Sequence, residues 1–202
     1  MCISARAQAR RAGLSERVSI RQGNVNAMPF EDESFDWAWS VDCVGHVSIG
    51  QPLDGLRELA RVVRPGGRVA ILGYSSQMLL PGHPRLEARL NATASATTVL
   101  AEGNDPRAHF TRALGWFREA GIADPTARTV VGTVHAPLDD GIHRALISLF
   151  GMLWGEMQST MDDADRAEYL RLTEPDSLDF ILDEEDYYAF FTYSIFEGRV
   201  HD

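Results

Sequence analysis

A strand–helix–strand pattern between residues 34 and 74 constrains the fold of this chain more than any other feature of its sequence. A short run that alternates large and small residues, 35–40, precedes a polar loop, and a helical pattern then ends at the Pro-Gly-Gly sequence of residues 65–67. A second apolar run covers residues 68–74. Two strands joined through a helix pair in parallel with a right-handed crossover. The pattern therefore predicts an α/β protein with a parallel sheet.

Residue spacing also predicts which faces of these elements are buried. Phe35, Trp37 and Trp39 fall on one face of the first strand, whereas Ala38 on the other face leaves room for a closely packed helix. The following helix carries apolar residues at helical spacing, including Leu56 and Leu59, which we expect to lie on the sheet. The run 69–72 is apolar throughout, as in a fully buried parallel strand.

The rest of the chain continues the α/β alternation. Good helix formers, alternating strand-like runs and Gly or Pro stops predict further elements. These are a helix at 4–12, a strand at 18–22, helices at 86–100 and 110–120, a strand at 128–135, two helices within 141–172 and a final strand at 188–200. We expect one domain over residues 1–202, with a helical insertion at about 141–182.

Composition excludes several classes of partner. The 202-residue chain has a formal net charge of −10, which disfavours nucleic acid and anionic membranes and favours a small-molecule or weakly basic partner. Apolar runs are shorter than the roughly 20 residues that span a bilayer, and the N-terminal residues lack a hydrophobic signal core, so we expect a cytoplasmic protein. The two cysteines, Cys2 and Cys43, are too few for a zinc cluster, and we expect free thiols and no metal.

Three stretches in the first third of the chain carry a resemblance to a known family. They are Gly23–Phe30, Ser34–Trp39 and Leu59–Ile71, and they occur in the order and at the spacing of the middle motifs of class I S-adenosylmethionine-dependent methyltransferases of the small-molecule type. The resemblance extends from about Ser4 to about Val131. It implies a Rossmann-like sheet that ends with a C-terminal antiparallel strand, S-adenosyl-L-methionine as cofactor and a small-molecule acceptor. Ligands of such sheets bind outside the carboxyl ends of the strands.

The resemblance implies a set of cofactor-binding residues. Residues 23–30, which we name the adenine-side loop, begin with Gly23, Asn24 and Val25. The family commonly has an aspartate where this chain has Asn24, and that aspartate accepts a hydrogen bond from the adenine amino group. An asparagine oxygen can accept the same hydrogen bond, and the Val25 N–H can reach a ring nitrogen. Asparagine is also an ordinary turn residue, and both interpretations stay open. Ser40 lies where the family places residues beside the cofactor.

Candidates for catalysis and substrate binding follow the two strands of the central pattern. Asp42 and His46 lie where the family lines the space between the cofactor methyl group and the substrate, and either side chain is a candidate to orient or deprotonate the acceptor. Tyr74, at the expected end of the second strand, is a candidate wall of the substrate site. A loop histidine and a packing tyrosine are the simpler interpretations of His46 and Tyr74. Methyl transfer depends largely on positioning and does not require a base.

Two family features are absent from this sequence. No Gly-x-Gly occurs, and no strand ending in a ribose-binding acid precedes the first helix. In the family sheet order 3-2-1-4-5-7-6 this leaves the strands at 18–22 and 35–40 without their neighbours. We therefore expect an N-terminally truncated methyltransferase that binds S-adenosylmethionine weakly. The alternative is a non-catalytic half-fold that uses Phe150, Trp154 and the final strand to bind a partner chain. Another nucleotide-binding enzyme is disfavoured because the chain has no P-loop or dinucleotide motif.

Overall fold

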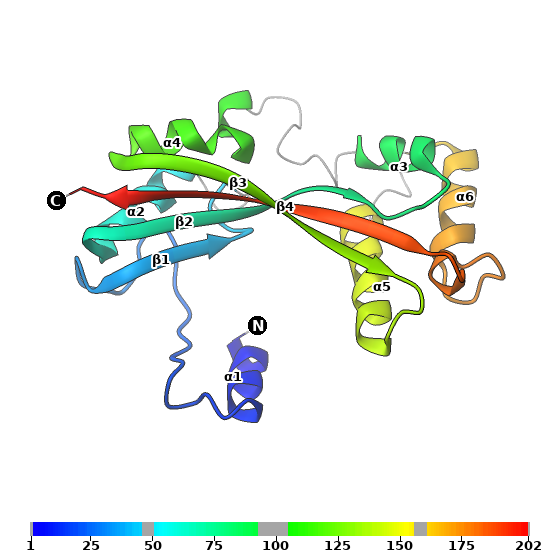
Figure 1. Cartoon of the computed structure of the whole chain (residues 1–202), viewed down its shortest axis with the longest axis horizontal. Helices are drawn as coiled ribbons and strands as arrows, with labels where there is room; N and C mark the ends of the chain where they lie inside the picture. The colour runs from blue at the N-terminus through cyan, green and yellow to red at the C-terminus, as the bar shows by residue number, and fades with distance from the viewer. Residues whose placement is uncertain (1, 46–50, 93–104, 156–160, 202) are drawn as a thin grey trace.

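A four-stranded mixed sheet forms the centre of the computed structural model, which describes residues 2–45, 51–92, 105–155 and 161–201 (Figure 1). The strands lie in the order β1-β2-β4-β3, with β1 parallel to β2 and the other two pairs antiparallel. Their bounds are β1 Phe35–Val41, β2 Val63–Met78, β3 Ile122–His135 and β4 Tyr188–Val200. The expected parallel pair and the antiparallel final strand are confirmed, and the order agrees with 4-5-7-6 of the family sheet.

The predicted crossover helix is confirmed, and it packs against the parallel pair. Helix α2 (Pro52–Val62) begins with a proline, which suits the first helical position because no N–H is needed there. Leu56 and Leu59 on its inner face are 0% and 4% exposed. They join the proximal cluster, to which α4 (Ala113–Glu119) also contributes. Its buried members are Val44, Leu56, Leu59, Val62, Val63, Val69, Ile71, Ala113, Trp116, Phe117, Ile122 and Phe196.

The turn into β2 differs slightly from the prediction. Helix α2 ends at Val62, and Val63 already pairs with Phe35 of β1. The pairing register then shifts, so that Trp37 pairs with Arg68 and the Pro-Gly-Gly residues form an irregularity between two paired positions. Gly66 has φ +74°, a left-handed conformation that a side chain disfavours. The Pro-Gly-Gly sequence thus lies in a bulge within the parallel pairing of β1 and β2.

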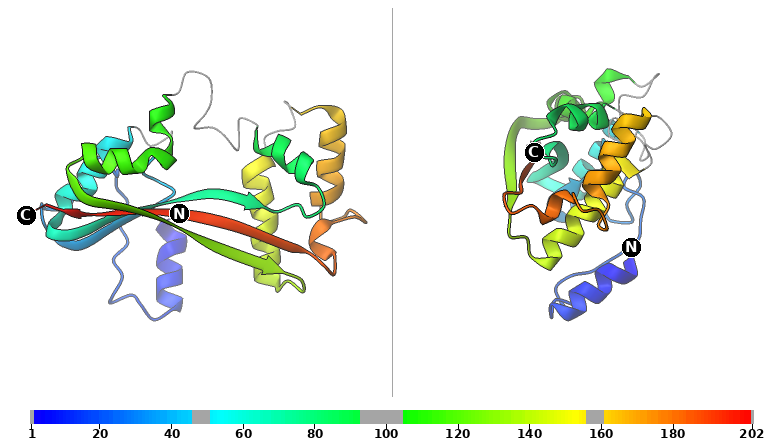
Figure 2. Two further views of the ribbon diagram at one scale, coloured as in Figure 1. Left: turned by 45° about the horizontal axis from the view of Figure 1, so that its top comes forward. Right: turned by 90° about the vertical axis from the view of Figure 1, so that its right-hand side faces the viewer.

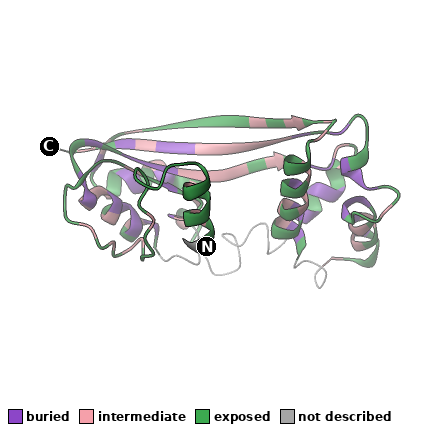
Figure 3. Ribbon diagram, turned by 90° about the horizontal axis from the view of Figure 1, so that it is seen from below, coloured by how far each residue is buried: buried purple, intermediate pink, exposed green. Residues whose placement is uncertain are grey.

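A second group of helices packs at the other end of the long strands (Figure 2). These are α3 (Pro84–Asn91), α5 (Asp140–Trp154) and α6 (Asp163–Thr173), with the short 3-10 helix η6 (Ile181–Asp183). Their apolar side chains and those at the strand ends form the distal cluster. Its buried members are Leu79, Leu80, Leu86, Leu90, Leu146, Phe150, Trp154, Tyr169, Leu172, Phe180, Ile181, Leu182, Tyr187 and Ala189. Buried residues therefore gather at the two ends of the sheet (Figure 3).

The distal cluster corrects part of the partner-chain alternative. Phe150 and Trp154, suggested there as partner-binding residues, are 2% and 0% exposed. The Trp154 ring stacks on Phe150 with centroids 5.9 Å apart, and its indole N–H donates to Asn91 at 3.1 Å. Both side chains are consequently core residues of this chain, and they present no surface to a partner.

Of the two elements predicted before residue 23, the structure confirms one and contradicts the other. The strand expected at 18–22 is wrong: these residues have no regular secondary structure, and Val18 is 44% exposed. An extended segment becomes a strand only through pairing, and within the described residues 18–22 have no ladder partner. The helix expected at 4–12 is confirmed as α1 (Cys2–Arg11), which lies away from the sheet at the end of a long irregular connection (Figure 1).

Strand β1 exposes one of its faces. Trp37 and Trp39 are 51% and 58% exposed, and their rings stack with centroids 5.5 Å apart. Ala38 on the opposite face packs against the proximal cluster, as the spacing predicted. The alternation of β1 was therefore predicted correctly, although its tryptophan face is not a core face in the described chain.

The remaining boundaries differ by a few residues or fall outside the described ranges. Helix α3 begins at Pro84, and the end of the helix expected at 86–100 lies outside the described residues. The helix expected at 110–120 divides into the 3-10 helix η4 (Phe110–Arg112) and α4, preceded by η3 (Pro106–Ala108). None of the helices in the described ranges has the length and apolar content needed to cross a membrane.

Candidate functional site

Asp42 is the best-defined polar residue at the carboxyl end of β1. Its backbone has φ +47°, which is uncommon for a residue with a side chain. The conformation is held by hydrogen bonds to β2 and β4. On β2, the Leu72 carbonyl accepts the Asp42 N–H at 2.9 Å, and the Tyr74 N–H donates to Asp42 Oδ1 at 2.8 Å. Its Oδ2 accepts the hydroxyl of Tyr193 on β4 at 3.0 Å. The carboxylate is therefore fixed across the sheet at the expected rim.

Tyr74 lies in an aromatic group on β2 and β4. The structure corrects its expected place at a strand end, because β2 continues to Met78 by pairing with β4 beyond the end of β1. Tyr74 faces Tyr193 edge-on at 5.5 Å between ring centroids and stacks against Phe191 at 6.3 Å. Its buried hydroxyl has no hydrogen-bond partner within the described residues. Burial raises the pKa of Tyr74, so the hydroxyl is a neutral potential donor.

Tyr193 is a site residue that the sequence reasoning missed. Burial, together with the nearby charge of Asp42 and the hydrogen bond to it, raises the pKa of Tyr193 to about 12. The folded chain thus holds this proton more tightly than an unfolded chain with an ordinary value of 10.0. The resulting stabilisation is complete below about pH 10 and is lost as the pH rises through about 12. The pair of a carboxylate acceptor and a neutral hydroxyl donor is consequently stable at physiological pH.

We expect the substitution Asp42→Asn to lower the pKa of Tyr193 from about 12 towards the ordinary tyrosine value. The value should stay above 10.0 because burial, the largest cause, is unchanged. Titration of the ¹³Cζ tyrosine resonances measures this change. Tyr187 is an internal control, since its pKa is raised by burial, Glu87 and Tyr74 rather than by Asp42. An identical Tyr193 titration in the variant would contradict the observed contact.

The other predicted residues near β1 have different surroundings. Ser40 is only 8% exposed, and its Oγ accepts the Val44 N–H at 3.1 Å, so the hydroxyl fastens the turn that follows β1. Cys43 is a free, half-buried cysteine, as expected. His46 falls outside the described residues, which end at 45 on this side and resume at 51.

The adenine-side loop folds into a compact turn. The Asn24 side-chain oxygen accepts the Asn26 N–H at 3.0 Å, and the Asn24 carbonyl accepts the Ala27 N–H at 3.1 Å. Val25 packs against the proximal cluster. A carboxamide oxygen has two lone pairs, so Asn24 can still accept a second hydrogen bond while it closes this turn.

Gly55 on α2 brings the two predicted halves of the site together. A Cβ on Gly55 would lie 3.1 Å from Asn26 Oδ1 and 3.1 Å from Val44 Cγ2. The adenine-side loop and the turn after β1 therefore meet over this glycine, and any side chain there would push them apart. The sequence alone did not indicate this role, because a glycine within a helical pattern indicates only a lower helix propensity at that position.

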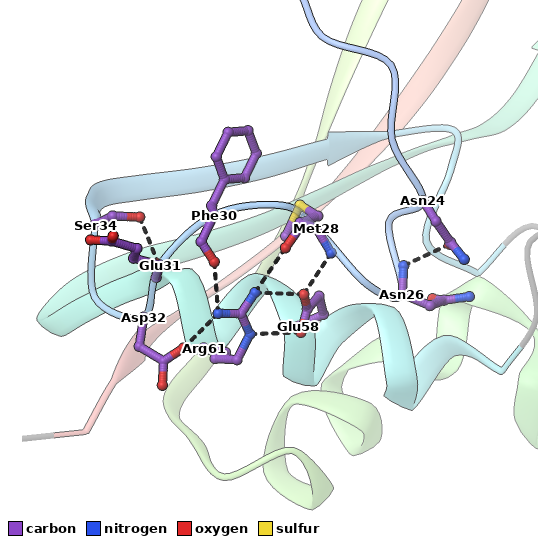
Figure 4. Close-up of polar contacts among 9 residues, drawn as sticks. All are labelled: Asn24, Asn26, Met28, Phe30, Glu31, Asp32, Ser34, Glu58 and Arg61. Carbon is purple, nitrogen blue, oxygen red and sulfur yellow. Dashed lines mark hydrogen bonds and ion pairs between the residues drawn. The ribbon is translucent and has the colours of Figure 1, made fainter.

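Arg61 of α2 is a second feature that the sequence reasoning missed (Figure 4). Its guanidinium donates to the carbonyl oxygens of Phe30 at 2.9 Å and Met28 at 3.2 Å and forms an ion pair with Asp32 at 2.5 Å. Glu58, one turn earlier, accepts from Arg61 at 2.7 and 2.8 Å and also accepts the Met28 N–H at 2.7 Å. The hydrogen bond from Arg61 is the main cause that lowers the pKa of Glu58, with burial acting against it.

The donor set fits the adenine end of S-adenosylmethionine. The Asn24 side chain presents an oxygen of the kind to which an adenine amino group can donate, and the Asp42–Tyr193 pair lies after β1. No described residue corresponds to the acid that grips the ribose hydroxyls in the family. Among the described residues no group of three His, Cys, Asp or Glu side chains is placed to hold a metal ion.

A shallow pocket of about 450 Å³ lies elsewhere, at the start of α3. His83, Arg85, Arg89 and Glu168 contribute to its lining. Three of these side chains are already paired, since His83 contacts Glu168 at 2.7 Å and Arg89 forms an ion pair with Asp165 of α6. This pocket is therefore distinct from the rim of β1, and its side chains serve the contact between α3 and α6.

Comparisons with known proteins agree with the expected family. Residues 1–71 match the methyltransferase domain family model. The methyltransferase GfsG of Streptomyces halstedii is 40% identical over 67 residues, which are 33% of this chain and 23% of that protein. A demethylmenaquinone methyltransferase of Clavibacter sepedonicus is 29% identical over 138 residues, covering 63% of this chain and 56% of that protein. The chain therefore spans about a quarter of the first relative and a little over half of the second.

A solved structure shares the fold of the whole chain. The YcgJ protein of Bacillus subtilis superposes with a TM-score of 0.51 at 16% identity, covering 100% of this chain and 79% of that one. The similarity at this level of identity concerns the fold alone. Together with the sequence matches it confirms the predicted fold class, a Rossmann-like α/β sheet with a C-terminal antiparallel strand.

Proposed function

We propose that this chain transfers a methyl group from S-adenosylmethionine to a small-molecule acceptor, at the rim formed by the adenine-side loop and the carboxyl end of β1. The premise is that the chain resembles the class I S-adenosylmethionine-dependent methyltransferases in its fold and in the sequence of residues 1–71. The observation that carries this proposal is the meeting of the two loops over Gly55. Two segments that the family uses for cofactor and substrate are thereby held next to each other on one helix.

Each site residue has a role in this proposal. Gly23 begins the adenine-side loop, where a Cβ would lie in ordinary contact 3.5 Å from Pro29 Cδ, and Asn24 and Val25 bind the adenine edge. Ser40 keeps the turn after β1 in shape through its bond to Val44, and it acts on the cofactor side indirectly. His46, like Asp42, stays a candidate base. The cofactor supplies an activated methyl group, so the chain needs mainly to bind and orient the acceptor.

Asp42 and the aromatic group bind the acceptor. With Tyr193 donating to Oδ2 and the Tyr74 N–H donating to Oδ1, the carboxylate keeps lone pairs for a hydroxyl or amine proton of the acceptor. Asp42 would accept that proton, while the bound cofactor would supply the methyl group by breaking its sulfur–methyl bond and leaving as S-adenosylhomocysteine. The rings of Tyr74 and Phe191 offer apolar contact to an uncharged acceptor.

The class of acceptor follows from charge and from the relatives. The chain carries a net charge of −10, which disfavours nucleic acid, and the Clavibacter relative is named for demethylmenaquinone, a small molecule. We place the activity in the cytoplasm, with no membrane partner. Because the chain spans 23% and 56% of the two relatives, activity and acceptor are proposals for the residues present here.

Methyl transfer from labelled S-adenosylmethionine to a panel of phenols, quinols and amines tests the proposal. We expect label in a neutral small molecule and a loss of about tenfold or more in rate for Asp42→Asn. Asp36→Asn is the matched control, because Asp36 lies on the same strand but is exposed and paired with Arg64 at 2.9 Å. Equal loss in both variants, or label in RNA only, would contradict the assignment.

A further inference from the structure

The adenine-side loop has few backbone partners of its own. Pro29 has no N–H to donate, and a loop outside the sheet must satisfy its carbonyl groups by other means. The carbonyl groups on either side of Pro29, those of Met28 and Phe30, both point to the Arg61 guanidinium (Figure 4). One side chain of α2 thus binds both carbonyl groups, and the Met28 carbonyl also accepts the Phe30 N–H at 2.8 Å.

Glu58 completes the attachment of the loop. Glu58 accepts the Met28 N–H at 2.7 Å and two hydrogen bonds from Arg61. Met28 is therefore bound to α2 through its N–H, by Glu58, and through its carbonyl group, by Arg61. The side chains of Arg61 and Glu58 are 31% and 14% exposed, and the pair is therefore partly shielded from solvent. Asp32 extends the contact beyond the loop.

The attachment is next to the turn proposed to bind adenine. Asn24 and Met28 are joined through the turn in which the Ala27 N–H donates to the Asn24 carbonyl. Motion of Met28 away from α2 would accordingly move Asn24 and Val25. The guanidinium geometry matters here, because a planar fork can bind two carbonyl groups and two carboxylates at once, whereas a lysine ammonium presents three donors around one point.

We propose that Arg61, together with Glu58, is a positioning residue for cofactor binding: it holds the adenine-side loop on α2 in the conformation that recognises adenine. This inference rests on the proposed function. Arg61 does not contact the cofactor in this account; it acts through the backbone of Met28 and Phe30.

The test measures loop opening and cofactor affinity in the same variants of the full chain. Amide hydrogen exchange of residues 24–30 reports the loop, and ligand-observed NMR titration with S-adenosylhomocysteine gives the dissociation constant. We expect Arg61→Gln to speed exchange in the loop and to raise the dissociation constant about tenfold. Arg61→Lys should fall in between, because it keeps the charge but loses the fork.

Two arginines close to Arg61 provide matched controls. Arg57 is exposed on the same helix, and Arg64 is 63% exposed and paired with Asp36. Their glutamine variants should change neither loop exchange nor affinity. The raised Tyr193 pKa should persist in Arg61→Gln, which shows that the acceptor side of the site is intact.

Each outcome decides a separate question. Faster loop exchange with an unchanged dissociation constant would show a purely structural arginine and overturn the inference, as would unchanged exchange. A general loss of protection across the sheet would likewise overturn it. Absence of S-adenosylhomocysteine binding by the unsubstituted chain would instead refute the proposed function, and this result is recognised before any variant is made.

Discussion

Replacing Gly67 with alanine is expected to lower the free energy of unfolding by about 3 kcal/mol. A Cβ at this position would lie 2.5 Å from Val63 Cγ1, 2.7 Å from the Asp36 carbonyl oxygen and 2.8 Å from the Arg64 carbonyl oxygen. Two of these three atoms belong to the backbone, so relief requires β1 and β2 to separate. Urea denaturation followed by circular dichroism measures the change.

Gly115 is the matched control for this substitution. It lies within α4, and a Cβ there would meet no atom within 4 Å. Alanine at this position should raise stability by about 0.5–1 kcal/mol, because glycine is a poor helix former. If Gly67→Ala were as stable as the unsubstituted chain, the close approach of the Pro-Gly-Gly turn to β1 would be incorrect.

A second large effect is expected in the distal cluster. Trp154→Ala should cost about 3–5 kcal/mol, because the side chain is fully buried and its removal leaves a large cavity. Loss of the stacking on Phe150, the edge contact with Tyr169 at 6.2 Å and the hydrogen bond to Asn91 adds to the cavity term. Thermal and urea denaturation measure this difference.

Met152 on the same helix serves as the control. It is 70% exposed, and Met152→Ala should change stability by no more than about 0.5 kcal/mol. The pair of variants also distinguishes a core from a partner-binding surface. Should Trp154→Ala leave the monomer fully stable, the distal cluster would not be the core that the structure describes.

Local sequence patterns predicted the central helix and strands because the spacing of apolar residues in each element reflects its own geometry. The spacing of Leu56 and Leu59 identified the buried face of α2, and alternation identified the two faces of β1. Alternation also predicted a strand at 18–22, and there it was wrong, since a strand depends on a neighbour that the pattern does not contain. Sheet order and the antiparallel final strand came from the family resemblance rather than from local spacing.

The site was predicted in part for the same reason. Asp42 was singled out because the family resemblance places it between cofactor and substrate, and in the structure it follows β1. Tyr193 was missed because it joins Asp42 through the pairing of β4 with β2, which brings together residues far apart in the chain. Arg61 was missed because an arginine on the outer face of a helix has the same pattern whether it is solvated or bound to a loop.

Recognition of S-adenosylmethionine at the adenine-side loop is tested most directly by a binding measurement. Saturation-transfer NMR with S-adenosylhomocysteine suits this purpose, because it detects even weak complexes and reports which ligand protons touch the protein. We expect the adenine H2 and H8 protons to receive the strongest saturation, and Asn24→Ala to reduce it. No saturation at about 1 mM ligand, or saturation strongest at the amino-acid end, would contradict the account.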